Sequence, residues 1–326
     1  MKNVCIVGCG AISGVHIESI KNCRNAVLYG ICDVDESKKK KADDLSVAFF
    51  KDFDDALADK NIDSVHICTP HCLHADMIKK ALGQGKTVVC EKPCAITTAE
   101  FEELKKTPGI EKVCFVMQNR LNRSVEELKK LIDDKTLGEI KGITAILAWH
   151  RTKEYYNSAK WRGKWHSEGG GVLINQAIHA LDLMSYLAGD ITKVKANMTN
   201  YSLRDIIEVE DTFVSHMEIE NGVNGMFFAT NANADDEDFS ITVYFEKGKA
   251  SYILGKLFIN NEEVCENNDI PAGKRCWGSG HRKLISNFYD ENKFFDIESV
   301  DNTYKALFAM YESAKNNGTE IIIQGL

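Results

Sequence analysis

The sequence predicts an α/β fold with two domains: a doubly wound parallel sheet, then a second α/β domain whose sheet is open and mainly antiparallel. Three observations support this prediction. Strand and helix patterns alternate through the first 120 residues, and a glycine-rich turn joins the first strand to the first helix. From about residue 120, long segments of alternating apolar and polar residues take over. A chain of 326 residues has room for two domains, which we expect at 1–120 and 121–326.

The composition excludes several kinds of partner. With 44% hydrophobic and 27% charged residues, it is typical of a soluble globular protein. The net charge is -8 and no arginine-rich block occurs, which argues against nucleic acid, because phosphate binding needs a basic surface. No segment has the ~18 consecutive apolar residues of a membrane span. We therefore expect a small-molecule substrate, with neither nucleic acid nor membrane as a partner.

The eleven cysteines predict a reducing compartment. Their number is odd, and five of them lie in apolar, strand-like runs: Cys5, Cys32, Cys68, Cys90 and Cys114. This pattern fits buried free thiols better than a disulfide framework. We therefore expect a cytoplasmic protein.

The first strand and the turn after it have the pattern of a dinucleotide-binding loop. Residues 2–7 are predicted to form a buried parallel strand, and the run 8–14, Gly-Cys-Gly-Ala-Ile-Ser-Gly, separates it from a helix ending near Asn22. Gly8 permits a tight turn, and Gly10 lets the backbone approach a pyrophosphate at the positive end of the helix. The glycines alone are weak evidence, but their place between a strand and a helix makes the prediction specific.

An acidic residue follows the second strand, which is expected at Ala26–Cys32. Asp33 lies about twenty residues past the glycines, where a carboxylate would bind the ribose hydroxyls of the cofactor. Asp33 and Asp35 would repel a 2′-phosphate, so we expect NAD rather than NADP. The alternative is that Asp33 caps the N-terminus of a helix.

The alternation continues to about residue 117. We expect strands at Val47–Phe50, Ser64–Thr69, Thr87–Cys90 and Lys112–Met117, and helices at Asp52–Ala58, Leu73–Gly83 and Thr98–Lys106. Pro70 and Pro93 follow two strand ends, at the carboxyl edge where open α/β sheets bind ligands. Four residues with metal-binding side chains lie near the first of these turns: Cys68, His71, Cys72 and His74. Their spacing matches no standard zinc pattern, so we expect no metal there.

The second half is predicted to form one large sheet with a covered face. Its strands are expected at Ile143–Arg151, Lys193–Tyr201, Thr212–Ile219, Gly225–Asn231, Phe239–Phe245 and Ala250–Leu254. In Phe239–Phe245 the odd positions are apolar and the even ones mostly polar, which indicates an antiparallel sheet with one face buried. Helices are expected at Val125–Asp133 and Val300–Asn317, the second one capped by Gly318.

Residues 169–182 form the most informative stretch of this half. Three glycines lead into a run predicted to be one helix, on which Asn175, His179 and Asp182 fall within a narrow angular sector. The rest of the circumference is largely apolar, so this helix should be buried. The buried polar groups need partners, and a polar ligand or a protein hydrogen-bond network would both serve.

Several motifs, in this order and spacing, resemble those of the Gfo/Idh/MocA oxidoreductases, which include inositol dehydrogenase and glucose–fructose oxidoreductase. The strongest are Glu91-Lys92-Pro93 after the fifth strand and Gly-Gly-Gly…Asn…His…Asp at 169–182. The weaker matches are Gly8-Cys9-Gly10-Ala11-Ile12, Cys68-Thr69-Pro70…His74, Trp161-Arg162-Gly163 and Gly280-His281. Together they cover nearly the whole chain.

The resemblance implies an N-terminal Rossmann domain and a C-terminal α/β domain, through whose open sheet family members often form homodimers or homotetramers. It implies that Lys92 lies beside the nicotinamide, that His179 is the catalytic acid/base, and that the Lys92–Pro93 bond is cis. The implied cofactor-binding residues are Gly8, Gly10, Ala11, Ile12, Asp33, Thr69, Pro70, His74, Glu91 and Lys92. The implied substrate-binding residues are Lys92, Asn175, His179, Trp161 and Arg162. Trp161 and Arg162 could instead serve interdomain packing.

One position departs from the family pattern, which usually has Asp four residues before the histidine, where this chain has Asn175. An amide can hydrogen-bond a sugar hydroxyl but cannot act as a base, so the role of base falls on His179. The departure also resembles a subgroup that acts on nucleotide-linked amino sugars.

These residues predict an oxidoreductase that transfers a hydride between NAD and a hydroxyl-bearing carbon of a sugar, nucleotide-sugar or cyclitol. His179 would accept the hydroxyl proton and Lys92 would stabilise the alkoxide, while Asp182 could orient the imidazole or bond within the core. Two other functions remain open. One is an NAD-dependent glycosidase or eliminating enzyme that uses transient oxidation. The other is a non-catalytic sugar or dinucleotide sensor, which would need neither Lys92 nor His179.

Overall fold

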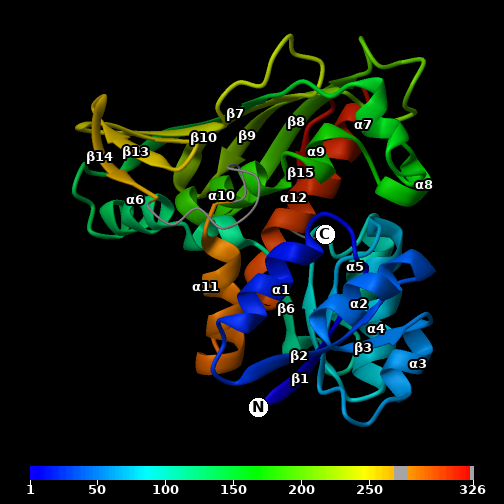
Figure 1. Cartoon of the computed structure of the whole chain (residues 1–326). Coiled ribbons are helices and arrows are strands. Elements are labelled where there is room, and N and C mark those ends of the chain that lie inside the picture. The colour runs from blue at the N-terminus through cyan, green and yellow to red at the C-terminus, as the bar shows by residue number, and fades with distance from the viewer. Residues whose placement is uncertain (268–277, 324–326) are drawn as a thin grey trace.

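The computed structural model describes residues 1–267 and 278–323, which form two sheets with helices packed around them (Figure 1). The elements of the N-terminal part are β1 (Lys2–Val7), α1 (Ser13–Lys21), β2 (Ala26–Cys32), α2 (Lys39–Leu45), β3 (Ala48–Phe50), α3 (Phe53–Ala58), β4 (Ser64–Ile67), α4 (His74–Gly83), β5 (Thr87–Cys90), α5 (Thr98–Lys105) and β6 (Val113–Phe115).

The elements that follow are α6 (Arg123–Asp133), β7 (Ile140–Ala148), α7 (Lys153–Asn157), α8 (Trp165–Glu168), α9 (Val172–Asn175), α10 (Ile178–Ala188), β8 (Ile191–Thr199), β9 (Thr212–Ile219), β10 (Val223–Thr230), β11 (Ser240–Phe245), β12 (Gly248–Ile253), β13 (Lys256–Ile259), β14 (Glu262–Glu266), α11 (Gly280–Ser286), α12 (Ile297–Lys315) and β15 (Ile321–Ile322). The sequence patterns did not predict α7, α8, α11 and β13–β15, which are short and lack a full period of apolar residues.

The first sheet is a doubly wound parallel sheet with the strand order β3-β2-β1-β4-β5-β6. Its central strands β1, β4 and β5 are short and largely buried, as parallel strands covered by helices must be. The strand order reverses direction between β1 and β4, so the turns after these two strands lie side by side. The predicted fold class is confirmed for this part of the chain.

The second sheet has nine strands in the order β14-β13-β12-β11-β7-β10-β9-β8-β15. Only β7 and β10 run parallel, and the other neighbours are antiparallel, which confirms the predicted sheet type. Burial alternates along β9, whose buried residues face the side covered by α10 and α12. Figure 1 shows these helices beneath the sheet, between it and the N-terminal part. The opposite face carries exposed apolar side chains, among them Val214, Met226 and Phe228.

The last helices return to the N-terminal part. Figure 1 shows α11 beside α1, and α12 reaching from the second sheet down to α5. Leu284 and Phe288 pack with Val89 and Cys114 of the parallel sheet. The predicted division at residue 120 therefore remains a prediction, since C-terminal residues contribute to the core around the first sheet.

Two predictions about the whole chain can be compared with the structure. Ten cysteines lie in the described residues and all are free thiols, while Cys276 lies outside the described residues. The five predicted buried cysteines are buried, but Cys68 directly follows β4 and is not inside a strand. Among the described helices, none combines the length and the apolar character that crossing a bilayer would require.

Candidate active site

A cavity of about 490 Å³ opens at the carboxyl edge of the parallel strands and is closed from the other side by residues 147–180 and Phe239. All the residues that the sequence predicted for the site line this cavity: Gly8, Gly10, Ala11, Ile12, Asp33, Thr69, Pro70, His74, Glu91, Lys92, Trp161, Arg162, Asn175 and His179. The structure therefore brings them together, while the role of each remains a prediction.

The glycine turn fits a pyrophosphate. Gly8 has a φ of +90°, and a Cβ there would lie 2.7 Å from the carbonyl oxygen of Cys68, so only glycine suits this position. The space where a Cβ of Gly10 would lie is open. The N-terminus of α1 has no side-chain cap, so no side chain competes with an anion at the positive end of this helix.

Asp33 is fixed at the end of β2 by two backbone donors. Its Oδ2 accepts from the Cys9 N–H at 2.7 Å, and its Oδ1 accepts from the Asp35 N–H at 2.9 Å. The alternative that Asp33 is a helix cap is wrong, because Asp35 is the residue that caps the next helical turn, by accepting from the Ser37 N–H. Asp33 remains at the cavity wall, where its carboxylate can accept from a ribose.

His74 joins two turns of the cavity wall. Its Nδ1 lies 2.7 Å from the Pro93 carbonyl oxygen, and its Nε2 lies 2.8 Å from the Thr69 carbonyl oxygen. His71 bonds through Nδ1 to the Glu168 carbonyl oxygen. Both imidazoles thus hold backbone segments in place, and burial lowers the pKa of each.

Lys92 connects the two parts of the chain. The Lys92–Pro93 peptide is cis, as the resemblance implied. The Lys92 side chain donates to the backbone oxygen of Asn175 at 2.5 Å, and its Nζ lies 3.5 Å from Asn175 Oδ1. This contact holds the ammonium group at the junction between the cofactor side and the substrate side of the cavity.

The helix predicted at 169–182 is broken, which corrects the sequence prediction. α9 ends at Asn175 and α10 begins at Ile178. Gln176 lies in this break, and its side chain bonds to the Tyr155 hydroxyl and to Asn231. It leaves the Asn175 carbonyl oxygen to accept from Lys92.

His179 lies at the start of α10 and is half-buried, with its side chain in the cavity wall. Burial, and then the positive charge of Lys92, lower the pKa of His179 to about 3, so its imidazole is neutral at physiological pH. Its Nε2 lies 3.3 Å from Gln118 Nε2, and its Nδ1 has no partner among the described residues. A neutral imidazole in this position can accept a proton.

Asp182 does not orient His179. It is completely buried and forms a bidentate ion pair with Arg120, at 2.9 and 2.5 Å, and accepts from the Thr303 hydroxyl. Of the two roles that the sequence left open for Asp182, the structure shows bonding within the core.

Glu168 is a site residue that the sequence analysis missed. Its buried carboxyl group accepts from the Asn175 side-chain amide and from the Gly163 N–H, and burial raises its pKa to about 7. It therefore fixes which way the amide of Asn175 points, with Oδ1 toward Lys92. Its position directly before the three glycines was the available signal.

The structure shows the packing role of Trp161, whereas ligand binding by Trp161 and Arg162 remains a prediction. Trp161 packs on His71, with ring centroids 4.7 Å apart, and so contributes to interdomain packing. The Arg162 guanidinium stacks 4.2 Å above the Tyr155 ring, and its buried Nε has no partner among the described residues. Because both side chains also line the cavity, Arg162 presents a positive charge to any ligand there.

Comparisons with known proteins agree with this architecture. Residues 2–118 match a family model described as an oxidoreductase family with an NAD-binding Rossmann fold, and residues 125–251 match the GFO/IDH/MocA C-terminal domain. The chain is similar to glucose-6-phosphate 3-dehydrogenase of Bacillus subtilis, with 30% identity over 94% of this chain and 93% of the relative. It is 24% identical to myo-inositol 2-dehydrogenase of Thermotoga maritima over 75% of this chain and 73% of the relative.

Among solved structures, the chain is similar to the WlbA dehydrogenase of Bordetella pertussis, solved with NADH and UDP-GlcNAcA. The TM-score is 0.88 and the identity 28%, over 98% of this chain and 97% of the other. Levoglucosan dehydrogenase in complex with NADH has a TM-score of 0.85 at 19% identity over the whole of both chains, which shows a shared fold.

Proposed function

The chain belongs to the Gfo/Idh/MocA family of NAD-dependent oxidoreductases, and we propose that it oxidises a hydroxyl group of a sugar that carries an anionic group, with a nucleotide-linked sugar as the favoured kind. One observation supports this most strongly. Lys92, Asn175 and His179 line the same cavity as the glycine turn and Asp33, so a base, a cation and a hydrogen-bonding amide lie beside a dinucleotide site.

Each residue has a distinct task in this proposal. NAD, when bound, accepts the hydride from the hydroxyl-bearing carbon. His179 accepts the hydroxyl proton at an imidazole nitrogen, and Lys92 stabilises the negative charge that develops on the oxygen. Asn175, whose amide is oriented by Glu168, positions a hydroxyl group and does not take a proton.

The anionic group of the substrate is inferred from Arg162 and from the relatives. The Arg162 side chain is half-buried, and its buried Nε, which has no partner among the described residues, would gain a charge-assisted hydrogen bond from a carboxylate or a phosphate. The substrate of the Bacillus relative carries a phosphate, and the ligand of the Bordetella structure is a nucleotide-linked sugar acid. Asn175, in place of the usual Asp, also favours the nucleotide-linked kind.

The test is NADH formation, followed by absorbance, with a panel of free sugars, inositols, sugar phosphates and UDP-linked sugars. We expect stoichiometric NADH with at least one anionic sugar and much lower kcat/KM with its uncharged counterpart. Product formation without NADH accumulation would indicate transient oxidation, as in an NAD-dependent glycosidase. Ligand binding without any turnover would indicate a sensor, and either result would contradict the proposal.

The proposal includes a homodimer or homotetramer formed through the open face of the second sheet. Val214, Phe228 and Ile146 lie directly across three neighbouring strands of this face, and each is 36–47% exposed. Met226 and Tyr244 extend the same apolar patch, which is unusual for the surface of a monomer. Light scattering should give twice or four times the chain mass, and a monomer would contradict this part of the proposal.

We place this activity in the cytoplasm, without a nucleic-acid or membrane partner. Free buried thiols suit a reducing compartment, and the acidic net charge of -8 disfavours polyanions. Cell fractionation, together with a filter-binding assay for DNA and RNA, would test both statements.

A further inference from the structure

Aromatic rings and guanidinium groups alternate along the wall of the cavity on the substrate side. Arg162 lies over the rings of Tyr155 and Trp161, with 4.2 and 4.9 Å between its Cζ and the two ring centroids. Arg151 lies over Trp149 and over the same Tyr155 ring, at 4.8 and 5.5 Å. The order of this cation–aromatic stack is therefore Trp149, Arg151, Tyr155, Arg162 and Trp161, and all five residues line the cavity.

The rings hold the two guanidinium groups in place without using their hydrogen-bonding capacity. A cation over an aromatic ring is attracted by the electrons of the ring. The ring provides no oxygen acceptor, however, for the five N–H donors that a guanidinium group carries in its plane. Planar donors in fixed positions suit the oxygens of phosphate groups, which arginine often binds through two parallel hydrogen bonds.

Arg162 lacks an acceptor where it needs one most. Its buried Nε has no partner among the described residues. The carboxyl group of Glu168 accepts from the Asn175 amide and from the N–H of Gly163, and not from the neighbouring guanidinium group. A buried donor without an acceptor lowers stability, so an oxygen of a bound ligand would remove this cost.

Arg151 is held on one side and has donors left on the other. Its Nη1 donates to Asp236 Oδ1 at 2.9 Å and to the His150 carbonyl oxygen at 2.6 Å. The side chain of Arg151 is 14% exposed, whereas that of Asp236 is 60% exposed, so water screens this ion pair. Bonds within the described part of the chain leave Nε and Nη2 of Arg151 available to a ligand.

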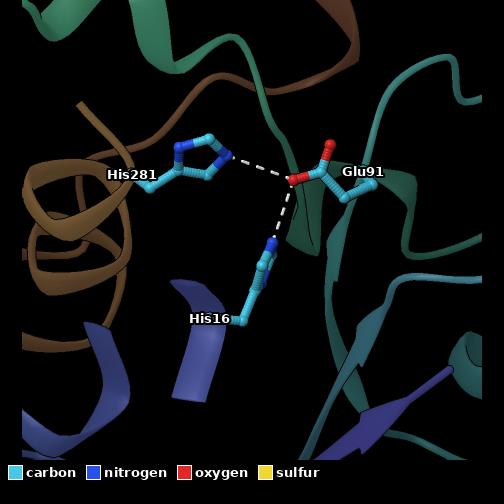
Figure 2. A group of neighbouring side chains, drawn as sticks. All are labelled: His16, Glu91 and His281. Carbon is cyan, nitrogen blue, oxygen red and sulfur yellow. Dashed lines mark hydrogen bonds and ion pairs between the residues drawn. The ribbon is translucent and has the colours of Figure 1, made fainter. Parts of the chain in front are cut away.

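Charged groups at the cofactor end of the cavity are already bonded within the protein. Figure 2 shows His16 and His281 directed at the same carboxylate oxygen of Glu91, with Nε2–Oε1 distances of 2.9 and 3.3 Å. Lys92 donates to the backbone oxygen of Asn175. For the pyrophosphate of the cofactor, this end offers the glycine turn and the uncapped N-terminus of α1. The cofactor therefore does not need the two arginines.

The stack extends outward from the groups proposed for the chemistry. Glu168 contacts both Asn175 and Gly163, and Arg162 directly precedes Gly163, so Arg162 lies at the inner end. Arg151 is one ring further along. A ligand that extends outward from the reacting hydroxyl group would therefore meet Arg162 first and Arg151 second. Two successive cations match two linked phosphate groups.

From this arrangement, and resting on the proposed dehydrogenase function, we infer that Arg151 and Arg162 form a subsite for the diphosphate group of a nucleotide-linked sugar. Arg162 binds the phosphate next to the sugar, and Arg151 binds the phosphate next to the nucleoside. Trp149, at the outer end, offers an aromatic surface to the base. The subsite thus selects sugars linked to a nucleoside diphosphate over sugars that carry a single phosphate.

Calorimetric titration of the NAD-saturated enzyme with UDP, UMP and glucose 6-phosphate tests this subsite without any turnover. Saturation with NAD fills the cofactor's own pyrophosphate site, so UDP binding then reports a second site. We expect UDP to bind about tenfold more tightly than either monophosphate, because only UDP reaches both arginines. Absence of UDP binding, or equal binding of UDP and glucose 6-phosphate, would overturn the inference.

Four variants assign the binding to the two arginines. Arg162→Gln should weaken UDP binding about tenfold and Arg151→Gln about threefold, with NAD affinity within about twofold of wild type. Arg162→Lys keeps the charge but lacks the planar donors, so it should also bind UDP several-fold more weakly. Arg204→Gln is the matched control, because Arg204 is exposed, belongs to the same half of the chain and donates to the Tyr201 carbonyl oxygen away from the cavity.

The variants also show which ligand the arginines serve. A loss of NAD affinity in place of UDP affinity would assign them to the cofactor, and UDP binding that neither variant changes would place it elsewhere. Either result would overturn the subsite. NADH formation from free sugars without UDP binding would leave the dehydrogenase standing and the subsite wrong. UDP binding that depends on both arginines, with no sugar oxidised, would support the subsite and contradict the proposed function.

Discussion

On the cofactor side of the cavity, the functional groups belong to turns that directly follow β1, β2, β4 and β5. On the substrate side, they are side chains placed by contacts between residues far apart in the sequence. Asp33 is held by two neighbouring backbone N–H groups, whereas Asn175 is held by Glu168 and contacts Lys92 from the other domain. The difference suggests that the two sides can be altered separately, with cofactor affinity on one side and chemistry on the other.

His179→Ala is expected to give the largest difference between its effect on turnover and its effect on NAD affinity. Loss of a general base typically lowers the rate by 10²–10⁴-fold, and we expect a fall of this order in kcat. NAD affinity should stay within about threefold, because the glycine turn and Asp33 do not contact His179. Stopped-flow kinetics measures kcat, and calorimetric titration measures NAD affinity. Near-normal turnover with NAD bound would contradict the prediction and would mean that residues 169–182 have a structural role.

Glu168→Gln should change stability in a pH-dependent way. Burial raises the pKa of Glu168 from its ordinary 4.5 to about 7, so between these pH values the folded state binds more protons than the unfolded chain. The contribution of this group to stability is therefore present below about pH 4.5 and is lost as the pH rises through 7, by about 3 kcal/mol.

Urea unfolding of the wild type at pH 5 and pH 8 should show this loss, and the difference should be smaller in Glu168→Gln. Glu126→Gln is a suitable control, because Glu126 pairs with Lys283 at the surface. An equal pH dependence in both variants would show that Glu168 does not titrate in this range.

Asp33→Asn tests the cofactor side. The carboxylate is expected to accept from the ribose and to repel a 2′-phosphate, so the variant should bind NAD about tenfold more weakly and discriminate less against NADP. Asp35→Asn should have a smaller effect, because Asp35 caps the next turn and does not line the cavity. Titration of both cofactors measures this, and a wild-type preference for NADP would contradict the role of Asp33.

Asn175→Ala should have the smallest effect on the chemical step. We expect KM for the sugar to rise about three- to tenfold with kcat nearly unchanged, since the amide positions a hydroxyl group. Initial rates over a range of substrate concentrations separate the two constants. A fall in kcat as large as that of His179→Ala would mean that positioning is the wrong role.

The same contrast between the two sides explains what the sequence could predict. Residues 8–14 lie between one strand and the next helix, and Asp33 directly follows the second strand, so both the fold and the cofactor edge could be inferred from local patterns. The break after Asn175 could not be predicted, because the apolar pattern runs through it. The bonds of Gln176 in this break join it to Tyr155 and Asn231, which lie far from it in the sequence.

Lys92 joins the two sides of the cavity. It lies in the turn after β5, on the cofactor side, and its side chain donates to the backbone oxygen of Asn175, on the substrate side.

The central claim is that Lys92 and His179 act on one substrate oxygen, the first stabilising its charge and the second taking its proton. The most direct test is kcat/KM for Lys92→Ala, His179→Ala and the double variant, with NAD binding measured alongside. We predict that the double variant loses clearly less than the product of the two single losses, because both groups serve one transfer. Losses that multiply fully while NAD stays bound would contradict the claim.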